Sequence, residues 1–233
     1  MTSWKLPAIA TSLLNLALPA ACAGCGAEGA ALCTDCRRSL AVRLELAAGV
    51  LMGLPGAMPL PLAQLEWSAP FAGVPRRALH RLKYGGEQRL AAPLAEAMAN
   101  RWRVAGAGGE LLVPVPVHAD RERLRGYDQA VLLAAAISAQ LAIPWRAALA
   151  RTRHTAPQFD LGRRARRSNV SGAFGLAGAS AARRTGNATA VCGRWVILVD
   201  DVVTTGSTLV ACAEVLYGCG AVAVSALTAA RER

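Results

Sequence analysis

Two carboxylates followed by a hydroxyl-rich turn form the chemically most informative segment of the chain. The apolar run Trp195–Val199 leads directly to Asp200 and Asp201, and the turn Thr204-Thr205-Gly206-Ser207-Thr208 follows. Such a run is typical of a strand buried on both faces of a parallel sheet, and the apolar pattern after the turn predicts a helix. A helix N-terminus offers free N–H groups to a phosphate, the hydroxyls add donors, and Gly206 lets the backbone approach closely.

The two carboxylates narrow the class of ligand. Asp200 and Asp201 would repel a phosphate alone, so they favour a ligand that also offers vicinal hydroxyls or a nearby magnesium ion. A ribose 5-phosphate offers both. The alternative is an ordinary strand that ends in acids and an N-capping turn. A phospho-acceptor receiver domain needs a late lysine, whereas Lys83 is the last one here, and the glycine-rich fingerprints of nucleoside triphosphatases and dinucleotide-binding proteins are absent.

A second segment carries basic side chains to the same predicted edge of the sheet. The strand expected over Glu110–Val117 is followed by His118 and by Arg121, Arg123 and Arg125. If this stretch is extended, arginines at every second position lie on one side and could neutralise a departing diphosphate. The alternative is a solvated basic turn. His118 could act as an acid or base, although a histidine beside arginines more often only hydrogen-bonds.

Two other basic segments could border the same site. The loop from Arg151 to Ser171 is rich in arginine and predicts either a cover that excludes water or a strip that contacts nucleic-acid phosphates. The helix predicted over Pro75–Leu82 ends with Lys83, Tyr84 and a glycine, a pattern that helix capping explains. Lys83 and Tyr84 could also line the ligand pocket.

Four of the seven cysteines lie within a short N-terminal stretch. Cys22 and Cys25 form one C-x-x-C step, and Cys33 and Cys36 form a second. Two such steps supply four thiolates for a tetrahedral structural zinc site that leaves no open position for catalysis. Disulfides are the competing interpretation, and a reducing cytoplasm would favour metal. The remaining cysteines are expected to be core residues.

The composition predicts a cytoplasmic protein with a preference for phosphorylated partners. The chain has 233 residues, 54% of them hydrophobic, and a net charge of +11, with Lys5 and Lys83 as its two lysines. Arginine binds phosphate in a bidentate fork, although a biased genomic base composition would also enrich it. No apolar stretch reaches the ~20 residues of a membrane span. Residues Leu6–Ala21 resemble a signal peptide only weakly.

The order of the predicted elements indicates an α/β protein with a small N-terminal appendage. We expect a helix and the zinc module in residues 1–45, a linker in 46–72 rich in Gly, Pro and Leu, and an α/β domain in 73–233. The domain's further predicted elements are a helix over Leu90–Val104, a helix over Val131–Leu141 and a last strand over 221–230. Such alternation favours a mostly parallel sheet with its ligand at the carboxyl ends of the strands.

Several motifs together resemble the ComF/GntX family of amidophosphoribosyltransferase-like proteins, which is associated with DNA uptake in natural competence. They are the two C-x-x-C steps, Lys83-Tyr84-x-Gly86, Val113-Pro-Val-Pro-Val-His118, Arg125-Gly-Tyr-Asp-Gln129, the stretch from Gln158 to Phe174, and the segment Val199–Thr208. The resemblance covers nearly the whole chain. It implies a type I phosphoribosyltransferase fold, a four-cysteine zinc module, and phosphoribosyl diphosphate (PRPP) with Mg²⁺ as ligand. Asp128 stands where the family often has asparagine.

The resemblance leads to a specific hypothesis of mechanism. A nitrogen nucleophile would displace pyrophosphate from PRPP, with Thr204, Thr205, Gly206, Ser207 and Thr208 at the 5-phosphate and Asp200 and Asp201 at the ribose hydroxyls. His118, Lys83 and Tyr84 would complete the substrate site, and the candidates for catalysis are Arg121, Arg123, Arg125 and Asp201. The alternative is a non-catalytic PRPP sensor or a scaffold that binds single-stranded DNA beside a competence helicase. The acceptor is not readable from the sequence.

Overall fold

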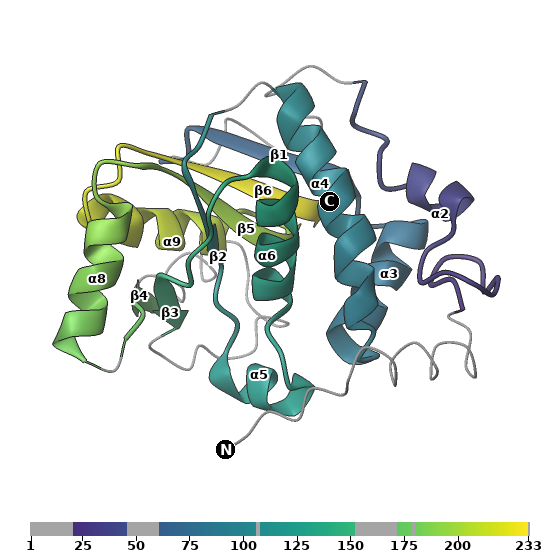
Figure 1. Ribbon diagram of the computed structural model, residues 1–233, viewed down its shortest axis with the longest axis horizontal. Helices are drawn as coiled ribbons and strands as arrows, with labels where there is room; N and C mark the ends of the chain where they lie inside the picture. The colour runs from purple at the N-terminus through teal and green to yellow at the C-terminus, as the bar shows by residue number, and fades with distance from the viewer. Residues whose placement is uncertain (1–20, 46–60, 106–107, 152–171, 179, 233) are drawn as a thin grey trace.

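The computed structural model describes residues 21–45, 61–105, 108–151, 172–178 and 180–232. Within these residues the centre is a fully parallel sheet with the strand order β1-β6-β5-β2 (Figure 1). The strands are β1 (Gln64–Pro70), β6 (Ala223–Arg231), β5 (Trp195–Val203) and β2 (Leu111–Pro114). Because β5 is an inner strand, Asp200 and Asp201 near its carboxyl end lie in the middle of the sheet.

Helices cover both faces of the sheet, as expected for parallel strands. One face packs against α3 (Gly73–Tyr84), α4 (Ala91–Ala105) and α6 (Gln129–Leu141), and the other against α9 (Ser207–Gly218). Alternate side chains of β5 enter the two cores. Ile197 belongs to the cluster with α3, α4 and α6, whereas Leu198 belongs to the cluster with α9. The expected α/β class with a mostly parallel sheet is therefore confirmed.

Smaller elements surround this framework. A 3₁₀ turn (Gln88–Leu90) precedes α4, and an antiparallel ribbon pairs β3 (Leu149–Arg151) with β4 (Phe174–Leu176). Helix α5 (Ala119–Arg125) follows β2, and α8 (Ala181–Val191) precedes β5. The sequence reasoning did not predict β3, β4, α5 or α8. The expected helices and strands elsewhere agree with α3, α4, α6, α9, β2, β5 and β6 to within a few residues.

Part of the predicted linker is a strand. Residues 64–70 form β1, which pairs with β6 along its length, so the segment adds an edge strand to the sheet. Residues 46–60 lie outside the described residues, as do 1–20, which contain the predicted N-terminal helix. The division into 1–45, 46–72 and 73–233 therefore stays a prediction.

The cysteine segment packs on the same face of the sheet as α3, α4 and α6. Its short helix α2 (Thr34–Arg38) and the preceding turns place Cys22, Leu32 and Leu40 in the same buried cluster as Leu79 of α3. Figure 1 shows this segment beside α3, at the side of the molecule away from α8. The described cysteine segment thus shares one hydrophobic core with the α/β domain.

A buried ionic cluster joins the cysteine segment, β1 and α4. Glu66 of β1 accepts hydrogen bonds from Arg101 Nε at 2.8 Å and from Arg43 Nη2 at 3.3 Å, and the side chains of all three are at most 5% exposed. The guanidinium of Arg43 also lies over the Trp67 ring, 3.6 Å from its centroid. Buried charges are tolerated when they are paired and hydrogen-bonded, so each member of this cluster requires the others.

Among the residues that the structure describes, no helix combines the length and hydropathy that crossing a bilayer would need.

The ionic cluster yields a test of stability. Replacing Glu66 by Ala leaves two buried guanidinium groups without their carboxylate, which should lower the free energy of unfolding by about 3–5 kcal/mol. The matched control is Glu96→Ala, because Glu96 pairs with Arg37 at 3.0 Å but its side chain is 50% exposed. That exposed pair should contribute about 1 kcal/mol or less. Urea denaturation measures both, and equal losses would contradict the central role of the buried cluster.

Candidate functional site

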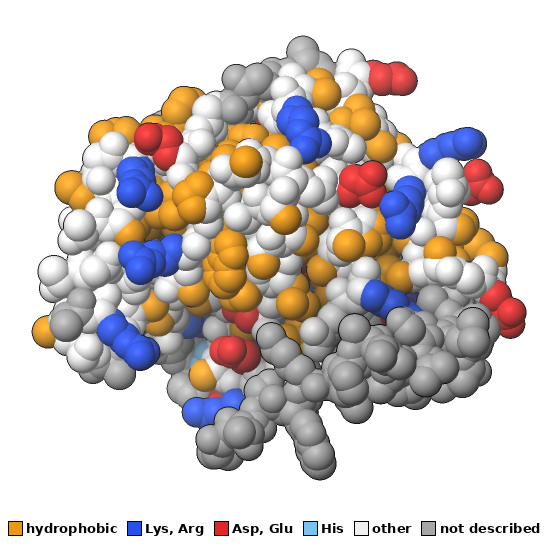
Figure 2. Space-filling view, viewed as in Figure 1, with side chains coloured by type: hydrophobic (Ala, Val, Ile, Leu, Met, Phe, Trp, Pro, Cys, Tyr) orange, Lys and Arg blue, Asp and Glu red, His pale blue; other side chains and the backbone are white. Residues whose placement is uncertain are grey.

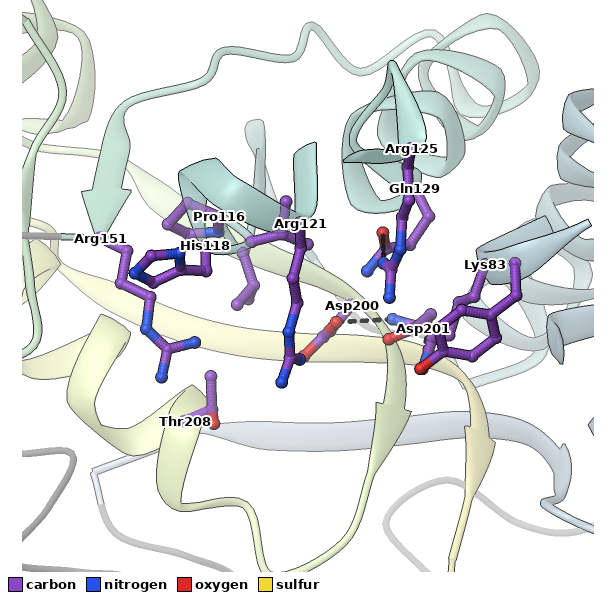
Figure 3. A pocket seen from close by; sticks show the side chains of 13 residues that line it. Lys83, Pro116, His118, Arg121, Arg125, Gln129, Arg151, Asp200, Asp201 and Thr208 are labelled. Atoms are coloured by element: carbon purple, nitrogen blue, oxygen red, sulfur yellow. Dashed lines mark hydrogen bonds and ion pairs between the residues drawn. The ribbon is translucent and has the colours of Figure 1, made fainter. Parts of the chain in front are cut away.

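A polar cavity of about 150 Å³ lies beyond the carboxyl ends of β2 and β5 (Figure 3). This is the edge of a parallel sheet at which ligands bind in open α/β folds. Elements that are far apart in the sequence converge there, namely the end of α3, the β2–α5 segment, α6, β3, β5 and the start of α9. The lining residues are Lys83, Tyr84, Val115, Pro116, Val117, His118, Arg121, Arg125, Gln129, Arg151, Asp200, Asp201 and Thr208.

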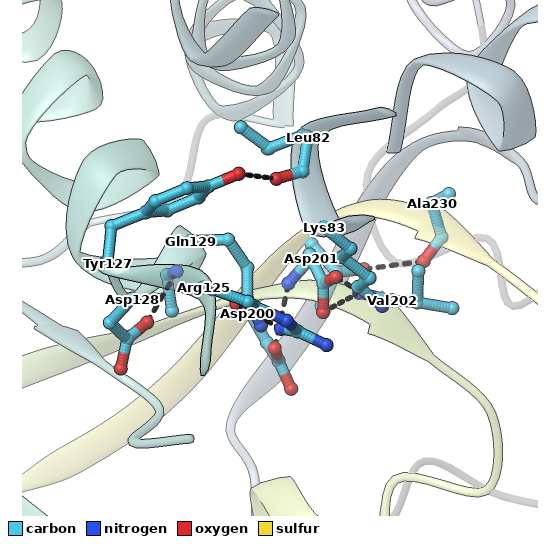
Figure 4. A network of polar contacts seen from close by, with 12 residues as sticks. Leu82, Lys83, Arg125, Tyr127, Asp128, Gln129, Asp200, Asp201, Val202 and Ala230 are labelled. Carbon is cyan, nitrogen blue, oxygen red and sulfur yellow. Dashed lines mark hydrogen bonds and ion pairs between the residues drawn. The ribbon is translucent and has the colours of Figure 1, made fainter. Parts of the chain in front are cut away.

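The floor of the cavity contains two carboxylates and one ammonium group. Asp200 and Asp201 are neighbours on β5, and Lys83 at the end of α3 forms an ion pair with Asp201 (Figures 3 and 4). Asp201 is only 4% exposed. Its Oδ1 accepts a hydrogen bond from the N–H of Val202 at 3.0 Å, and Asp200 Oδ1 accepts one from the N–H of Asp201 at 2.8 Å. Backbone donors and Lys83 thus hold the two carboxylates in place.

The surroundings change the proton affinities of this group. Burial raises the pKa of Asp200 from its ordinary value to about 7; Lys83 and Arg151 oppose the shift, and Asp128 adds to it. Desolvation lowers the pKa of Lys83, and the nearby Asp200 partly offsets that effect. Near neutral pH, Asp200 therefore exchanges between its neutral and charged forms, and a ligand can select one of them.

Three arginines line the same cavity as the carboxylates. Arg121 and Arg125 come from α5, and Arg151 comes from β3 (Figure 3). Arg125 donates a hydrogen bond to Oε1 of Gln129 at 2.8 Å, which holds its guanidinium beside the first residue of α6. The cavity therefore combines guanidinium groups with carboxylates, a combination that suits an anion which also bears hydrogen-bond donors.

The expectation of an extended arginine segment was wrong. Residues 119–125 form helix α5, in which positions four apart share a face, so Arg121 and Arg125 point to the cavity together. Arg123 is 79% exposed in its side chain, pairs with Asp120 at 3.3 Å, and does not line the cavity. Helix formation follows from an N-cap at His118 and from two acidic residues in the first turn.

The hydroxyl-rich turn joins β5 to α9 as expected. Gly206 has φ of +79°, a backbone conformation that favours glycine, and the helix begins at Ser207. The hydroxyls of Thr205 and Ser207 lie 2.8 Å apart and hydrogen-bond to each other. Thr208 lines the cavity, whereas Thr204, Thr205, Gly206 and Ser207 lie along the adjoining turn. The N–H of Ser207 donates to Thr205 Oγ1 at 3.4 Å, and the first turn of α9 borders the cavity through Thr208, where a phosphate could accept hydrogen bonds from its N–H groups.

Neighbouring polar residues hold the rim together. His118 Nδ1 accepts a hydrogen bond from the N–H of Asp120 at 3.2 Å, so this histidine caps α5 as well as lining the cavity. Asp128 caps α6 by accepting from the N–H of Ala130 at 2.7 Å (Figure 4). Tyr127 donates a hydrogen bond from its hydroxyl to the carbonyl of Leu82. The last contact ties the end of α3, and with it Lys83, to the start of α6.

The structure brings most of the predicted site residues to one cavity. Lys83, Tyr84, His118, Arg121, Arg125, Asp200, Asp201 and Thr208 line it. Sequence reasoning did not assign Gln129 to the site and treated Arg151 as the start of a loop. Both residues belong to polar or basic motifs of the sequence, but only the fold shows that they line the same cavity as Asp200. Residues 152–171, the predicted cover, lie outside the described residues.

The four N-terminal cysteines converge on a second site. The sulfur atoms of Cys22, Cys25, Cys33 and Cys36 all lie within 4.8 Å of one another. A tetrahedral zinc ion with Zn–S bonds of about 2.3 Å places its sulfurs about 3.8 Å apart. The Cys25 and Cys33 sulfurs are 3.7 Å apart, in agreement with that geometry. Gly24 leaves the necessary space, because a Cβ there would stand 2.4 Å from the Cys36 sulfur.

Backbone donors also favour a metal-binding thiolate. The N–H groups of Cys33 and Gly24 point at the Cys22 sulfur at 3.3 and 3.4 Å. Burial opposes the ionisation of Cys22, but these hydrogen bonds outweigh it and lower the pKa of the thiol, whereas burial raises the pKa of Cys36. Thiolates are the metal-binding form of cysteine, so the chemistry and the geometry of the cluster fit a metal ion.

Solved structures offer a partial likeness. The structure titled "Structure of the allosteric regulatory enzyme of purine biosynthesis" superposes with a TM-score of 0.40 at 16% identity, over 60% of this chain and 26% of that one. Glutamine phosphoribosylpyrophosphate amidotransferase from B. subtilis gives a TM-score of 0.38 at 17% identity, over 58% and 25%. The chain thus spans about a quarter of the length of both enzymes. No family model matches it.

Curated relatives are more similar. DNA utilization protein YhgH of Escherichia coli K12 is 33% identical over 172 residues, which are 71% of each protein. The Salmonella typhimurium protein of that name is 31% identical over 210 residues, 83% of this chain and 87% of the relative. Competence protein F of Haemophilus influenzae Rd is 41% identical over 101 residues, 43% of this chain and 41% of that protein. The chain belongs to the ComF family, whose members include proteins named competence protein F and DNA utilization protein YhgH.

Proposed function

We propose that the cavity at the end of β5 binds PRPP with Mg²⁺ and that the protein acts as a phosphoribosyltransferase associated with DNA uptake. One observation carries the proposal: two carboxylates, a lysine, three arginines and a helix N-terminus surround a single cavity. PRPP carries a phosphate, two vicinal hydroxyls and a diphosphate, and each of these groups has a chemical complement there. A plain phosphate site would not need the carboxylates.

The turn before α9 is the proposed site of the 5-phosphate. Thr204 to Thr208 supply hydroxyl donors, and the first turn of α9 supplies N–H groups and the positive end of the helix dipole. Gly206 removes the side chain that would otherwise hinder the phosphate. In this proposal the β5–α9 turn binds a phosphate group, as short turns before helices do in other α/β proteins.

The carboxylates are the proposed partners of the ribose. Asp200 and Asp201 can each accept hydrogen bonds from the vicinal hydroxyls, and the ion pair with Lys83 orients Asp201. The intermediate proton affinity of Asp200 fits this role, because hydroxyl donors or a cation would stabilise its charged form.

The arginines are the proposed partners of the diphosphate. Arg121, Arg125 and Arg151 all line the cavity, and Figure 3 draws Arg121 between Arg151 and Arg125. When bound, Mg²⁺ would offset the negative charge of the diphosphate and so assist its departure. Arg123 has no such role in this proposal because it points to solvent and pairs with Asp120.

The proposed reaction is a displacement at the anomeric carbon of the ribose. The lone pair of a nitrogen nucleophile forms the new C–N bond, the C–O bond to the diphosphate breaks, and pyrophosphate leaves with the bonding pair. A proton carried by the nucleophile is released. Arg121 and Arg125 would stabilise the charge that develops on the leaving group, and the carboxylates would hold the ribose in line. Positioning and electrostatics would supply most of the rate.

The proposal for the cysteine cluster is a structural zinc ion. Four protein thiolates fill all tetrahedral positions, so no open position remains for a substrate or a reactive water. The ion would fix the turns that pack against α3, whose last residues reach the PRPP cavity.

A second candidate function is a non-catalytic one. In this alternative the protein senses PRPP without turnover and holds single-stranded DNA for the uptake machinery; the net charge of +11 and the relatives' names, DNA utilization protein and competence protein, support the DNA part. A competence helicase would be its partner. Turnover separates the two candidates. An enzyme releases pyrophosphate when it is given a nitrogen acceptor, whereas a sensor binds PRPP and releases no pyrophosphate.

Calorimetric titration with PRPP and Mg²⁺ tests the site. The double variant Asp200→Asn/Asp201→Asn should weaken binding roughly 100-fold or more, because each carboxylate loses charge-assisted hydrogen bonds worth about 1.5–3 kcal/mol. The control Asp35→Asn/Glu96→Gln removes the same number of negative charges from exposed positions outside the cavity. It should bind PRPP as the unchanged protein does. No binding by the unchanged protein would overturn the proposal.

The pH dependence of binding tests the role of Asp200. Its pKa is raised to about 7, so the protein must release a proton from Asp200 when a ligand selects the charged form. Affinity should therefore rise with pH up to about 7 and level off above it. PRPP itself titrates in the same range, but its contribution is the same for both proteins. A comparison with Asp200→Asn therefore isolates the contribution of Asp200. Titrations of both proteins from about pH 5.5 to 8.5 should differ in slope below pH 7, and parallel curves would exclude the role.

Metal analysis tests the cysteine cluster. We expect one zinc per chain by elemental analysis, a lower melting temperature after chelation, and a weaker affinity for PRPP because α3 loses part of its packing. The double variant Cys25→Ser/Cys33→Ser should behave like the chelated protein. Cys192, which was expected to be a core residue, is exposed and lies outside the cluster, so Cys192→Ser serves as the control. A protein without the two thiols that keeps its zinc would refute the assignment.

A further inference from the structure

The outward side of α3 carries a basic stripe that the proposed PRPP site does not use. Arg76, Arg77, His80 and Arg81 recur at intervals of three and four residues, so they lie on one side of the helix. Together with Gly73 they line a hollow of about 330 Å³ that is separate from the PRPP cavity. We name this group the α3 stripe.

The charge of the α3 stripe is positive along its length. Among the described residues, all lining side chains of the hollow are Arg or His, and none is acidic. Arg81 also pairs with Glu87 at 3.2 Å, whereas Arg76 and Arg77 are exposed at the start of the helix. Core packing explains Ala78, Leu79 and Leu82 on the buried side of α3, but it does not explain two exposed arginines in succession.

The stripe leads to the mouth of the PRPP cavity. Tyr84 is one helical turn beyond His80, and the two rings are 4.8 Å apart between their centroids. Tyr84 is 65% exposed and also lines the PRPP cavity. The guanidinium of Arg125 lies 4.9 Å from the Tyr84 ring centroid. One side of α3 thus combines guanidinium groups with an exposed aromatic ring at the entrance to the cavity.

We propose that the α3 stripe binds a single-stranded polynucleotide, whose phosphates contact Arg76, Arg77 and Arg81 while a base stacks at Tyr84. Proteins that bind single strands combine a basic track for the backbone with aromatic rings for the bases. The strand would then arrive at the cavity with one nucleotide beside the PRPP site. This makes a polynucleotide the ligand that shares the entrance with PRPP.

The dimensions suit a polymer better than a small anion. From Gly73 to Tyr84 the helix rises roughly 16 Å, at 1.5 Å per residue. That length spans about five phosphates at the 3.4 Å spacing of a stacked strand. On the face drawn in Figure 2 the basic side chains form separate patches with acidic groups between some of them. Binding at a defined track is therefore distinguishable from attraction to a uniformly charged surface.

Fluorescence anisotropy with a labelled single-stranded oligonucleotide of about 16 nucleotides tests the proposal. The double variant Arg76→Ala/Arg77→Ala should bind more weakly, and the slope of log affinity against log salt should decrease by about 1.4, at roughly 0.7 per lost phosphate contact. The control Arg183→Ala/Arg184→Ala removes the same charge from exposed positions on α8. Its slope should equal that of the unchanged protein.

Tyr84→Leu separates stacking from charge. It should weaken oligonucleotide binding roughly tenfold without changing the salt slope, since stacking involves no phosphate. Equal losses in the α3 and α8 variants would overturn the proposal, because they would indicate diffuse attraction. Equally effective competition by polyglutamate would overturn it too, because the stripe would then be a site for acidic peptides.

The inference rests on the proposed function only where it places the strand beside PRPP. Calorimetry on Arg76→Ala/Arg77→Ala should show PRPP binding unchanged, because neither residue lines the PRPP cavity. If the unchanged protein binds no PRPP but the α3 variant loses its oligonucleotide affinity, the proposed function fails and the α3 stripe stands. If PRPP binds and the α3 variant keeps full oligonucleotide affinity, the α3 stripe fails alone.

Discussion

The ion pair between Lys83 and Asp201 is the interaction on which the site depends. Two adjacent carboxylates at the end of an inner strand would repel each other and resist burial unless a cation compensates them. Lys83 supplies that cation from α3, an element more than a hundred residues away in the sequence. The site therefore forms only when the end of α3 is held beside the carboxyl end of β5.

Several contacts hold α3 in this position. The Tyr127 hydroxyl binds the carbonyl of Leu82, next to Lys83, and so links α3 to the start of α6. The opposite end of α3 packs against the cysteine segment, where Val74 lies near Gly24. The Glu66 cluster then joins that segment to the sheet through Arg43. The described part of the cysteine segment thus acts as a support for α3, and a metal ion bound there would reinforce the support.

The sequence allowed prediction of those features that arise from neighbouring residues. The β5 strand, the turn at Gly206 and the two C-x-x-C steps are local patterns, and the structure contains each of them. Strand β1 was missed because Glu66 interrupts its apolar pattern, and only the fold shows that Arg101 neutralises it. Helix α5 was missed because arginines at alternate positions suggested an extended chain, although its N-cap and acidic first turn favour a helix. Arg151 begins a basic segment of the sequence, but its place in the cavity depends on the pairing of β3 with β4, which no local pattern predicted.

The crystal structure of the protein with PRPP and Mg²⁺ is the most direct test of the central claim. The account predicts the 5-phosphate against the turn from Thr204 to Thr208, the ribose hydroxyls at Asp200 and Asp201, and the diphosphate beside Arg121 and Arg125. The Lys83 ammonium should still contact Asp201. PRPP bound with its diphosphate at the Thr204–Thr208 turn, or bound outside this cavity, would contradict the account.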